Sequence, residues 1–564
     1  MSERRAYAAD SPRSGMDDTT RVEWREWGQD AFDEAAESDV PVLLSLTATW
    51  CDHCHEMDAE TYAEPRIAAN VNDSFVPVRV DVDRYPRVRD RYNMGGFPST
   101  VFLAPDGKVL TGAGYLGPDG MRQVLDSVRT MWDTKGSGAA RVPRPLREDN
   151  PPAGELTADV ESAMLGQLSE SYDETAGGWG DSPKFPLPDA LEFALKRDRD
   201  MALRSYDAVG ANLLDEYDGG FYRFATDRDW SGLQREKLLD SNGALVRAFA
   251  NAYLHTGKDE YRDPADRTIE FLTTTLWNAD ADAFANSQAP GEDDAHSLDA
   301  TDRAAADEPP VDDGVLAGPN SLAIEGLLTY YAYTDDDRAR RYAERALATL
   351  REDLLEEGVV AHARDDDAVE RDADGDALPL LANQARALAA LTTAASTLET
   401  DVLEDATAVA EATIDRLHDE DSFLDGPAEG VGLCDRPLRP LDSNVAFADA
   451  LIDLAALTGE DRYREFARET LEAFAGASDR FTVQVARYAT AVSRLLEGPL
   501  VIRVAAEPGS DLHRAALRMA DHEKVVVPDA DCEAGTARVE RGDRMSERAE
   551  TPDELSERVQ SLLD

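Results

Sequence analysis

The stretch VLLSLTATWCDHCHEM, residues 42–57, decides how the first part of this chain folds. Its apolar start predicts a buried strand over residues 42–46, after which Cys51 and Cys54 stand at the beginning of a predicted helix. A helix N-terminus stabilises a cysteine as its thiolate, and two cysteines at this spacing can close a small disulfide. The motif therefore predicts thiol–disulfide exchange, with Cys51 as the attacking thiolate and Cys54 as the resolving thiol.

The elements expected after this motif occur in the order of a thioredoxin fold. A helix is predicted over residues 57–71, and strands are predicted over residues 75–82 and 101–104. Just before the last strand, Phe97 and Pro98 stand where thioredoxins carry the cis-proline that faces the cysteine pair. We therefore expect Pro98 to shape the groove that receives a substrate.

Trp50 and His53 flank the two cysteines and are predicted to support their chemistry. An imidazolium just before the second cysteine favours the thiolate and makes the disulfide more oxidising. One position departs from the thioredoxin pattern. Thioredoxins usually bury an acid six residues before the first cysteine to move protons, and this chain has Ser45 there.

Other uses of the motif stay open. The string from Cys51 to His55 also matches the C-x-x-C-H signature of covalent haem attachment, which normally follows export. A zinc site would need both cysteines and a histidine to share one helical turn. A thioredoxin fold whose disulfide no longer turns over is a further alternative. We expect no metal and no cofactor.

The composition of the chain is strongly acidic. It has 114 Asp and Glu residues against 58 Lys and Arg residues, which gives a net charge of −56 over 564 residues. Yet 42% of the residues are hydrophobic and fall in periodic blocks, so we expect packed cores. An acidic surface with only seven lysines suits a cytoplasm at molar salt, where screening removes self-repulsion. These features predict a halophilic protein without a nucleic-acid partner.

Cysteine usage and hydropathy bear on where the protein acts. Four cysteines, at positions 51, 54, 434 and 532, argue against a disulfide-stapled secreted protein. Residues 1–18 are polar and lack the apolar core of a signal peptide. No apolar run approaches the ~20 residues that a membrane span needs. We expect a soluble, cytoplasmic protein that does not contact a membrane.

The pattern of the sequence divides the chain into four parts. The thioredoxin-like pattern covers residues 20–134, and a linker rich in Gly, Pro and Arg covers residues 135–154. Residues 155–497 change to long helices with apolar residues at three- and four-residue spacing. Residues 498–564 predict a small α/β region, in which Cys532 is expected to be an unpaired thiol.

The long helical part contains a repeat. Asn242, Asn320, Asn383 and Asn444 each stand near the start of an apolar helix that is followed by an amphipathic one. The repeats recur at intervals of about 60 to 80 residues, which is a helical-hairpin period. Together with an earlier hairpin and a closing pair, they predict six inner and six outer helices, an (α/α)6 toroid. The fold class is therefore multidomain, α/β followed by all-α and a small α/β region.

The loops from outer to inner helices collect the unusual residues, and in a toroid these loops surround the mouth of a central funnel. Lys184 and Lys237 are the best clue, because lysine is so rare in this chain. Each could bind an anionic ligand or form an internal ion pair, for example with Glu236 or Asp240. Residues 290–313 predict a mobile acidic loop. The predicted funnel residues are Trp179, Asp181, Lys184, Phe221, Tyr222, Arg223, Glu236, Lys237, Asp240, Asn242, Asp312, Asn320, His362, Asn383, Asp442 and Asn444.

The order of a thioredoxin-like domain, an α-toroid and a small α/β tail resembles the spermatogenesis-associated thioredoxin-domain proteins. Residues 50–57 are similar to that family's Cys-His-Trp-Cys-His-x-Met string, and residues 177–186 to its Gly-Gly-Phe-x-x-x-Pro-Lys-Phe-Pro box. The toroid in turn resembles the six-hairpin glycosidases and the N-acylglucosamine 2-epimerase group. Residues 233–235 read Leu-Gln-Arg where the family commonly has Pro-His-Phe, so one funnel histidine is lost.

Two sugar chemistries compete for the toroid. Glycoside hydrolysis needs two carboxylates that face each other across the sugar, and the candidates are Asp181, Glu236, Asp240, Asp312 and Asp442. Asp240 and Asp442 also suit the N-cap of an apolar helix, which needs no catalytic role. Epimerisation by proton transfer generally uses a pair of histidines, and only His362 falls in a mouth loop.

The leading prediction is a thiol–disulfide oxidoreductase that acts on protein thiols or disulfides and whose toroid binds a substrate or partner. One alternative is a carbohydrate-processing toroid, acting on a sugar-like small molecule, with the thioredoxin-like domain as an accessory. The other is a non-enzymatic ligand-binding or scaffold protein with a redox-sensing disulfide.

Overall fold

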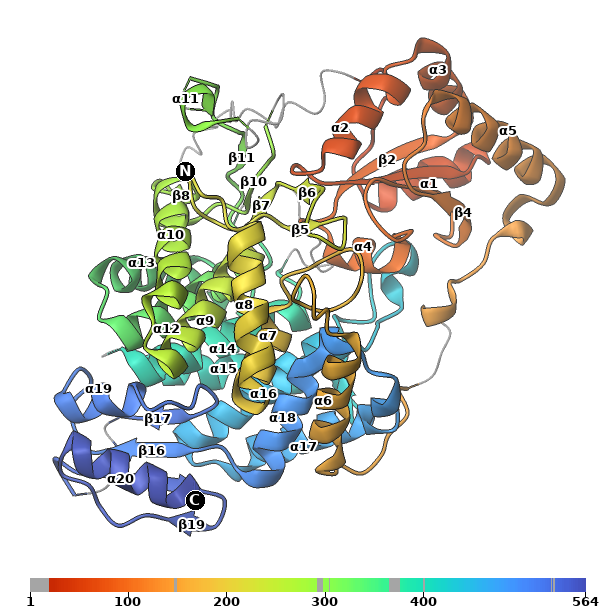
Figure 1. Ribbon diagram of the computed structural model, residues 1–564. Helices are drawn as coiled ribbons and strands as arrows, with labels where there is room; N and C mark the ends of the chain where they lie inside the picture. The colour runs from red at the N-terminus through yellow and green to blue at the C-terminus, as the bar shows by residue number, and fades with distance from the viewer. Residues whose placement is uncertain are drawn as a thin grey trace, which may run out of the picture. The chain divides into compact units, whose positions relative to one another are not determined.

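The computed structural model in Figure 1 describes residues 20–146, 150–291, 298–303, 305–364, 376–398, 401–528, 530 and 533–563. These residues form two compact units. The first contains the N-terminal part as far as Arg147 together with Glu429–Arg436, and the second contains residues 148–428 and 437–564. Cys532 and residues 292–297 of the predicted acidic loop lie outside the described residues.

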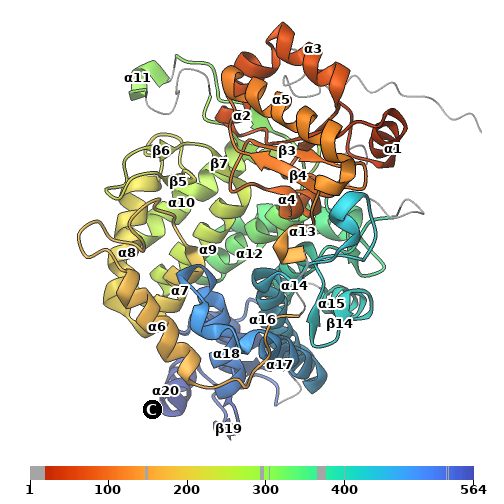
Figure 2. The same cartoon turned by 90° about the vertical axis from the view of Figure 1, so that its right-hand side faces the viewer.

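The first unit is built on a four-stranded sheet in the order β2–β1–β3–β4. Every residue of β1 is buried, and this strand pairs parallel with β2 and antiparallel with β3, which pairs antiparallel with β4. Helices pack on both faces of the sheet (Figures 1 and 2). The predicted thioredoxin-like fold is confirmed. Its elements are α1 Gln29–Ser38, β1 Val42–Thr47, α2 Asp52–Met57, α3 Pro65–Ser74, β2 Val76–Asp81, α4 Pro86–Tyr92, β3 Ser99–Leu103, β4 Val109–Ala113 and α5 Pro118–Lys135.

The helix predicted over residues 57–71 is not continuous. A π-helical turn, Asp58–Tyr62, follows α2, and α3 begins separately at Pro65. Proline has no backbone N–H to continue the ladder and is well suited to the first turn of a new helix. The break therefore follows from Pro65, which the apolar periodicity concealed.

The second unit contains a double ring of helices, and the predicted (α/α)6 toroid is confirmed. Each inner helix packs against the next one around the ring, and each is paired with an outer helix. The inner helices are α7 Pro188–Arg197, α9 Leu239–Thr256, α12 Ala317–Thr334, α14 Leu381–Thr397, α16 Leu441–Thr458 and α18 Ala486–Glu497. Their outer partners are α8 Arg199–Leu213, α10 Asp259–Thr274, α13 Asp337–Asp353, α15 Leu403–Leu417, α17 Asp461–Ala475 and α6 Asp159–Ser171.

Small residues let the inner helices approach closely. A Cβ atom added to Gly326 on α12 would lie 2.3 Å from the carbonyl oxygen of Gly243 on α9, so neither position has room for a larger side chain. Outer helices instead bury one face. On α13, Ala339 and Ala343 face the core, and Asp336 caps the first turn by accepting a hydrogen bond of 2.8 Å from the N–H of Ala339.

Short strands connect outer to inner helices at one end of the ring. Within the predicted acidic loop, β11 pairs with β10, and Arg303 on a short helix forms ion pairs with Asp215 and Asp218. This part of the loop is therefore held by specific contacts. The connecting elements are β5 Phe224–Ala225, β6 Leu233–Gln234, β7 Lys237–Leu238, β8 Trp277–Asn278, β9 Ala283–Phe284, β10 Ser287–Gln288, α11 Ala300–Arg303, β11 Val311–Asp312, β12 Leu355–Glu356, β13 Val359–Val360, β14 His418–Asp419 and β15 Ser422–Phe423.

The C-terminal residues form a second four-stranded sheet, in the order β17–β16–β18–β19. Its first pair is parallel and the other two are antiparallel, so strand order and direction repeat those of the first unit. This sheet lies at one end of the toroid (Figures 1 and 2), where Val501, Val525 and Val527 pack with Ala456 and Leu457. Its elements are β16 Val501–Val504, α19 Asp511–Leu517, β17 Val525–Val527, β18 Ala537–Arg541, β19 Arg544–Met545 and α20 Pro552–Leu563.

Candidate functional site

The cysteine pair lies at the start of α2. Cys51 is the N-cap residue, and its Sγ accepts a hydrogen bond of 3.2 Å from the N–H of Cys54. The two cysteines form a disulfide, and only 6% of Cys51 and 3% of Cys54 is exposed. Because the N-terminus of a helix favours negative charge, Cys51 is the sulfur that this arrangement would stabilise as a thiolate after reduction.

Trp50, which directly precedes Cys51, contacts the loop that carries the cis-proline. The Phe97–Pro98 peptide bond is cis, and the ring of Phe97 meets that of Trp50 edge to face with 6.1 Å between their centroids. Trp50 is buried, and its Nε1 donates a hydrogen bond of 2.7 Å to Asp83. His53 is exposed instead, with its Nδ1 3.2 Å from a carboxylate oxygen of Glu56.

A buried ion pair lies next to His55, after the cysteine pair in the chain. Ser45 is buried in β1, while Asp58 is buried in the turn after α2 and forms an ion pair with Arg79 of β2. Burial lowers the pKa of His55, and the charge of Asp58 opposes that shift. The Nε2 atom of His55 is buried without a hydrogen-bond partner among the described residues. Sequence reasoning did not single out Asp58 or Arg79.

The two rare lysines are buried in internal ion pairs. Lys184 donates to Asp173 at 3.1 Å, and Lys237 donates to Asp215 at 2.6 Å. Each lysine also donates to a glycine carbonyl in the loop that follows its aspartate, Gly177 or Gly219. Burial lowers the pKa of Lys237 to about 8, against the attraction of Asp215. The partners suggested by the sequence, Glu236 and Asp240, do not bind these lysines.

The repeated asparagines tie the mouth loops to the inner helices. Asn242, Asn320 and Asn444 are buried, and each accepts a hydrogen bond from the N–H of one phenylalanine and donates to its carbonyl. On α14 the equivalent residue is Gln384, which accepts a hydrogen bond from the N–H of Val360 and donates to the carbonyl of Gly358. The predicted repeat residue, Asn383, lies one position earlier and contacts His362 instead.

The other predicted funnel residues are scattered over the mouth loops. Asp181 is exposed, and the Arg223 guanidinium lies 3.1 Å from the carboxylate of Glu236. Trp179, Phe221 and Tyr222 are buried in the packing between loops and helices. Asp312 accepts a hydrogen bond from the N–H of Gly314.

A mouth cavity of about 280 Å³ is lined by the first turns of the inner helices. Of the predicted funnel residues, Asp240 and Asp442 line it. The helices begin at Leu239 and Leu441, so both aspartates stand inside the first turn and neither is the N-cap. Ser241 donates its hydroxyl to the carboxylate of Asp240 at 3.0 Å.

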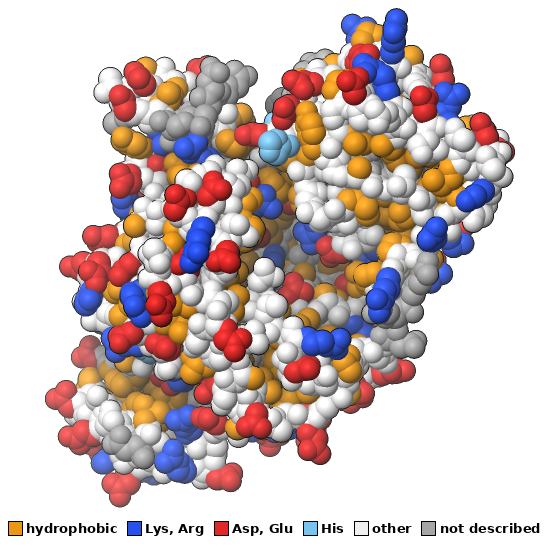
Figure 3. Space-filling model, turned by 45° about the vertical axis from the view of Figure 1, so that its right-hand side comes forward, with side chains coloured by type: hydrophobic (Ala, Val, Ile, Leu, Met, Phe, Trp, Pro, Cys, Tyr) orange, Lys and Arg blue, Asp and Glu red, His pale blue; other side chains and the backbone are white. Residues whose placement is uncertain are grey.

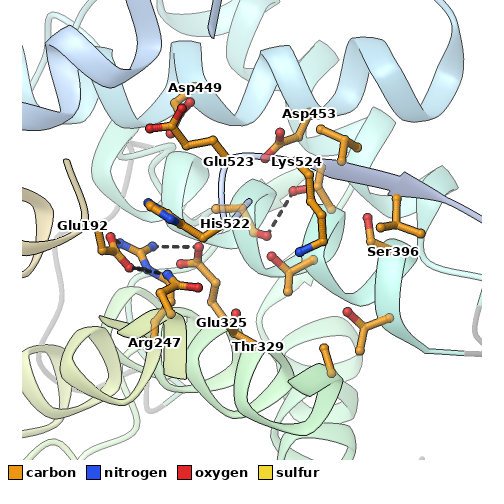
Figure 4. Close-up of a pocket in the computed structure, with 18 of the residues that line it drawn as sticks. Glu192, Arg247, Glu325, Thr329, Ser396, Asp449, Asp453, His522, Glu523 and Lys524 are labelled. Atoms are coloured by element: carbon orange, nitrogen blue, oxygen red, sulfur yellow. Dashed lines mark hydrogen bonds and ion pairs between the residues drawn. The ribbon is translucent and has the colours of Figure 1, made fainter. Parts of the chain in front are cut away.

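Sequence reasoning missed a network of charged side chains on the toroid axis. Arg247 on α9 binds Glu192 on α7 at 2.8 Å and Glu325 on α12 at 2.7 Å (Figure 4). On the other side, Arg494 on α18 binds Asp449 on α16. The signal that could have revealed the network is a charge in the middle of a helix that is otherwise apolar on every side.

The described parts of the chain give no sign of a metal or membrane site. Among them there is no group of three or more His, Cys, Asp or Glu residues placed to hold a metal ion. They also include no helix whose length and hydropathy would let it cross a membrane. Acidic side chains spread over the face shown in Figure 3, with Lys and Arg among them.

Comparison with known proteins identifies the class of the first unit. Residues 4–146 match the family Thioredox_DsbH, described as "Protein of unknown function, DUF255". The chain is 31% identical to Thioredoxin-1 of Drosophila melanogaster over 81 residues, which cover 14% of this chain and 72% of that protein. The chain therefore belongs to the thioredoxin family, and the sheet and cysteine pair of the first unit carry this fold.

A longer match concerns a particular relative. The chain is 30% identical to Spermatogenesis-associated protein 20 of Homo sapiens over 295 residues, which cover 45% of this chain. The match spans 37% of that protein's length. The resemblance stated from the sequence is confirmed. Among solved structures, a D-mannose isomerase is similar at a TM-score of 0.46 and 11% identity, over 60% of this chain and 96% of that chain.

Proposed function

We propose that this protein is a thiol–disulfide oxidoreductase whose reactive pair is Cys51 and Cys54. The observation that carries the proposal is the position of Cys51 at the N-cap of α2, within disulfide-bonding distance of Cys54. In the reduced protein, the Cys51 thiolate attacks one sulfur of a client disulfide and expels the other as a thiolate. Cys54 then attacks Cys51, which releases the reduced client and leaves the pair oxidised.

The surroundings of the pair suit a protein client. Phe97, next to the cis-proline Pro98, contacts Trp50, and His53 is exposed. We expect this loop to offer an apolar edge for an extended peptide. The buried Asp58–Arg79 ion pair and His55, which follow the cysteines in the chain, are polar groups that could take part in proton movement. Trp50 positions this region through its hydrogen bond to Asp83.

Reduction and trapping of the pair test the proposal. With insulin as the probe disulfide, the full chain should catalyse reduction by dithiothreitol, and Cys54→Ser should accumulate a mixed disulfide through Cys51. Cys51→Ser should lose both properties, while Cys434→Ser, which changes a buried cysteine, is the matched control. A pair that never exchanges with insulin or any added thiol would make this disulfide a structural one.

The assays belong at molar KCl, because we also propose that the protein works in a halophilic cytoplasm. The net charge of −56 and the scarcity of lysine support this setting. High salt screens repulsion between exposed carboxylates. Activity that falls steadily with added KCl would contradict the proposal of a halophilic setting.

A second candidate, carbohydrate processing in the toroid, is favoured by one observation. Asp240 and Asp442 line the same mouth cavity of about 280 Å³ and come from different inner helices, as a pair of glycosidic carboxylates would. Sugar-dependent turnover that is lost in Asp240→Asn and kept in Cys51→Ser would favour this function over the first.

A further inference from the structure

The second unit contains another cavity, of about 170 Å³, lined by the later turns of the inner helices. Residues from the second half of α12 and of α14 form one side of it, and the turn of residues 522–524, before β17, closes it. Asp189, Arg247 and Arg487 line both this cavity and the mouth cavity. The C-terminal sheet therefore supplies a wall for a chamber on the toroid axis.

The carboxylates that line this chamber all form ion pairs, and Arg247 is shared by three of them, Asp189, Glu192 and Glu325. The Arg247 guanidinium lies between Glu192 and Glu325, and Figure 4 shows these pairs on one wall. A carboxylate that is already held in an ion pair is less available to a ligand than a free one. The other pairs of the lining are Arg487–Asp449, Arg494–Asp449, Arg494–Asp453, Arg197–Glu523 and Lys196–Glu523.

Lys524 differs from the other cations of the lining, because none of the described carboxylates lies within ion-pair distance of it. Its Nζ donates to the backbone carbonyl of Asp521 at 3.1 Å and lies 5.2 Å from the centre of the Tyr333 ring. Figure 4 shows the side chain reaching into the cavity. Burial lowers the pKa of Lys524 to about 8, against the attraction of Asp521.

Hydroxyl groups form the wall near this ammonium. Thr329 on α12 and Thr393 and Ser396 on α14 line the cavity, and their hydroxyls have no hydrogen-bond partner among the described residues. Each can both donate to and accept from a ligand hydroxyl. Pockets for drug-sized molecules measure about 300 to 1,000 Å³, so this one suits a smaller molecule.

We propose that this chamber binds a small hydroxylated carboxylate, of the size and class of a single sugar acid. The carboxylate would pair with Lys524, and the hydroxyls would bind Thr329, Thr393 and Ser396. The paired arginines and carboxylates would set the shape of the chamber and exclude a second charged group. This ligand site is separate from the cysteine pair and does not depend on the oxidoreductase proposal.

Binding of D-gluconate and D-glucose to the full chain tests the proposal, with calorimetry and thermal melting at constant ionic strength. Gluconate should bind saturably and raise the melting temperature, and glucose, which lacks the carboxylate, should bind at least about tenfold more weakly. Lys524→Met should reduce gluconate affinity to that of glucose. Lys258→Met is the matched control, because Lys258 is exposed and paired with Glu260, and it should bind gluconate as the wild type does.

The melting temperature without ligand separates binding from a structural role. Removing an uncompensated buried charge should leave Lys524→Met at least as stable as the wild type, whereas a structural role predicts a loss. If this variant fails to fold, the double variant Thr329→Val, Ser396→Ala should still lose about fivefold in gluconate affinity. Failure of gluconate and D-glucuronate to bind the wild type, or equal binding by Lys524→Met, would overturn the proposal.

Discussion

His255 on α9 and His522 in the turn before β17 meet with 2.9 Å between Nε2 and Nδ1. One of these nitrogens must donate and the other accept, so the bond cannot survive protonation of both rings. Burial lowers the pKa of His255 to about 4 and that of His522 to about 3, and both rings are therefore neutral at pH 7. The charged groups that act on the pair are Asp521, Glu523, Lys196, Lys524 and Arg199.

This pair should make the second unit sensitive to mild acid. The unfolded chain takes up protons near pH 6.5, whereas the native rings stay neutral to about pH 4, so stability falls as the pH drops through this window. From pH 7 to pH 5 we expect a loss of about 2 kcal/mol per histidine in the free energy of unfolding, measured by denaturant titration. His522→Gln should remove about half of that slope, and His53→Gln, at an exposed site, should not. An unchanged slope in His522→Gln would contradict the assignment.

Residue-level prediction succeeded where the chemistry is local and failed where it is not. Cys51 and Cys54 are three positions apart, and their helix follows from adjacent residues. Lys184 and Lys237 stood out by rarity, but their partners lie 11 and 22 positions away in loops whose path the sequence did not reveal. Glu236 and Asp240, which the sequence suggested as partners, do not pair with either lysine.

At the scale of elements, the fourth residue of α9, α12, α14 and α16 is a joint that ties the inner helix to the loop before it. The side chain of Asn444 replaces a missing strand neighbour for Phe423, with bonds of 2.8 Å to its N–H and 2.9 Å to its carbonyl. Asn242 and Asn320 do the same for Phe221 and Phe284. An amide offers both donor and acceptor atoms, whereas a carboxylate at neutral pH can only accept.

Asn444→Ala should therefore destabilise the second unit. It leaves a buried N–H and carbonyl of Phe423 without partners, and each such group costs about 1–3 kcal/mol. We expect a loss of at least about 2 kcal/mol in denaturant titrations. Ser443→Ala, one residue earlier on the same helix, should change stability by less than about 0.5 kcal/mol. Equal effects at the two positions would mean that the joint is not the Asn444 amide.

Periodicity accounts for most elements that were predicted. The all-apolar helices and their amphipathic partners differ enough in pattern to assign inner and outer rings from sequence. From the sequence, the repeat position on α14 is assigned to Asn383, because asparagine marks the other repeats. The structure shows that the position within the helix decides the contact, and on α14 this position is Gln384. The strands β18 and β19 were missed because polar residues interrupt them.

The charged residues inside the toroid show that periodicity cannot predict contacts between helices. Arg247, Glu325 and Asp449 interrupt the apolar middle of their helices, and each looks like an exception until the ring brings the helices together. Their partners lie on other helices, so the network exists only in the folded unit. For the same reason, the chamber bordered by this network could not be predicted from the sequence.

At the scale of the whole molecule, the chain crosses between its two units more than once. The segment Glu429–Arg436 lies between α15 and α16 in the sequence, yet it belongs to the first unit. There, Arg91 of α4 donates to the carbonyls of Leu433 at 3.0 Å and Arg436 at 2.9 Å. The N–H of Leu433 donates in turn to the Tyr92 hydroxyl at 2.8 Å.

Arg91 is 3% exposed, so its guanidinium is a buried charge whose solvation comes from backbone carbonyls of this segment. Arg91→Met should release the segment without affecting the cysteine pair. Charge-assisted hydrogen bonds contribute about 1.5–3 kcal/mol, so amide exchange over residues 429–436 should accelerate by about 10- to 150-fold. Arg89→Met, on the exposed side of the same helix, should leave that exchange unchanged. Exchange that rises equally across all of the first unit would show global unfolding instead, and exchange that does not rise would mean that Arg91 does not hold the segment.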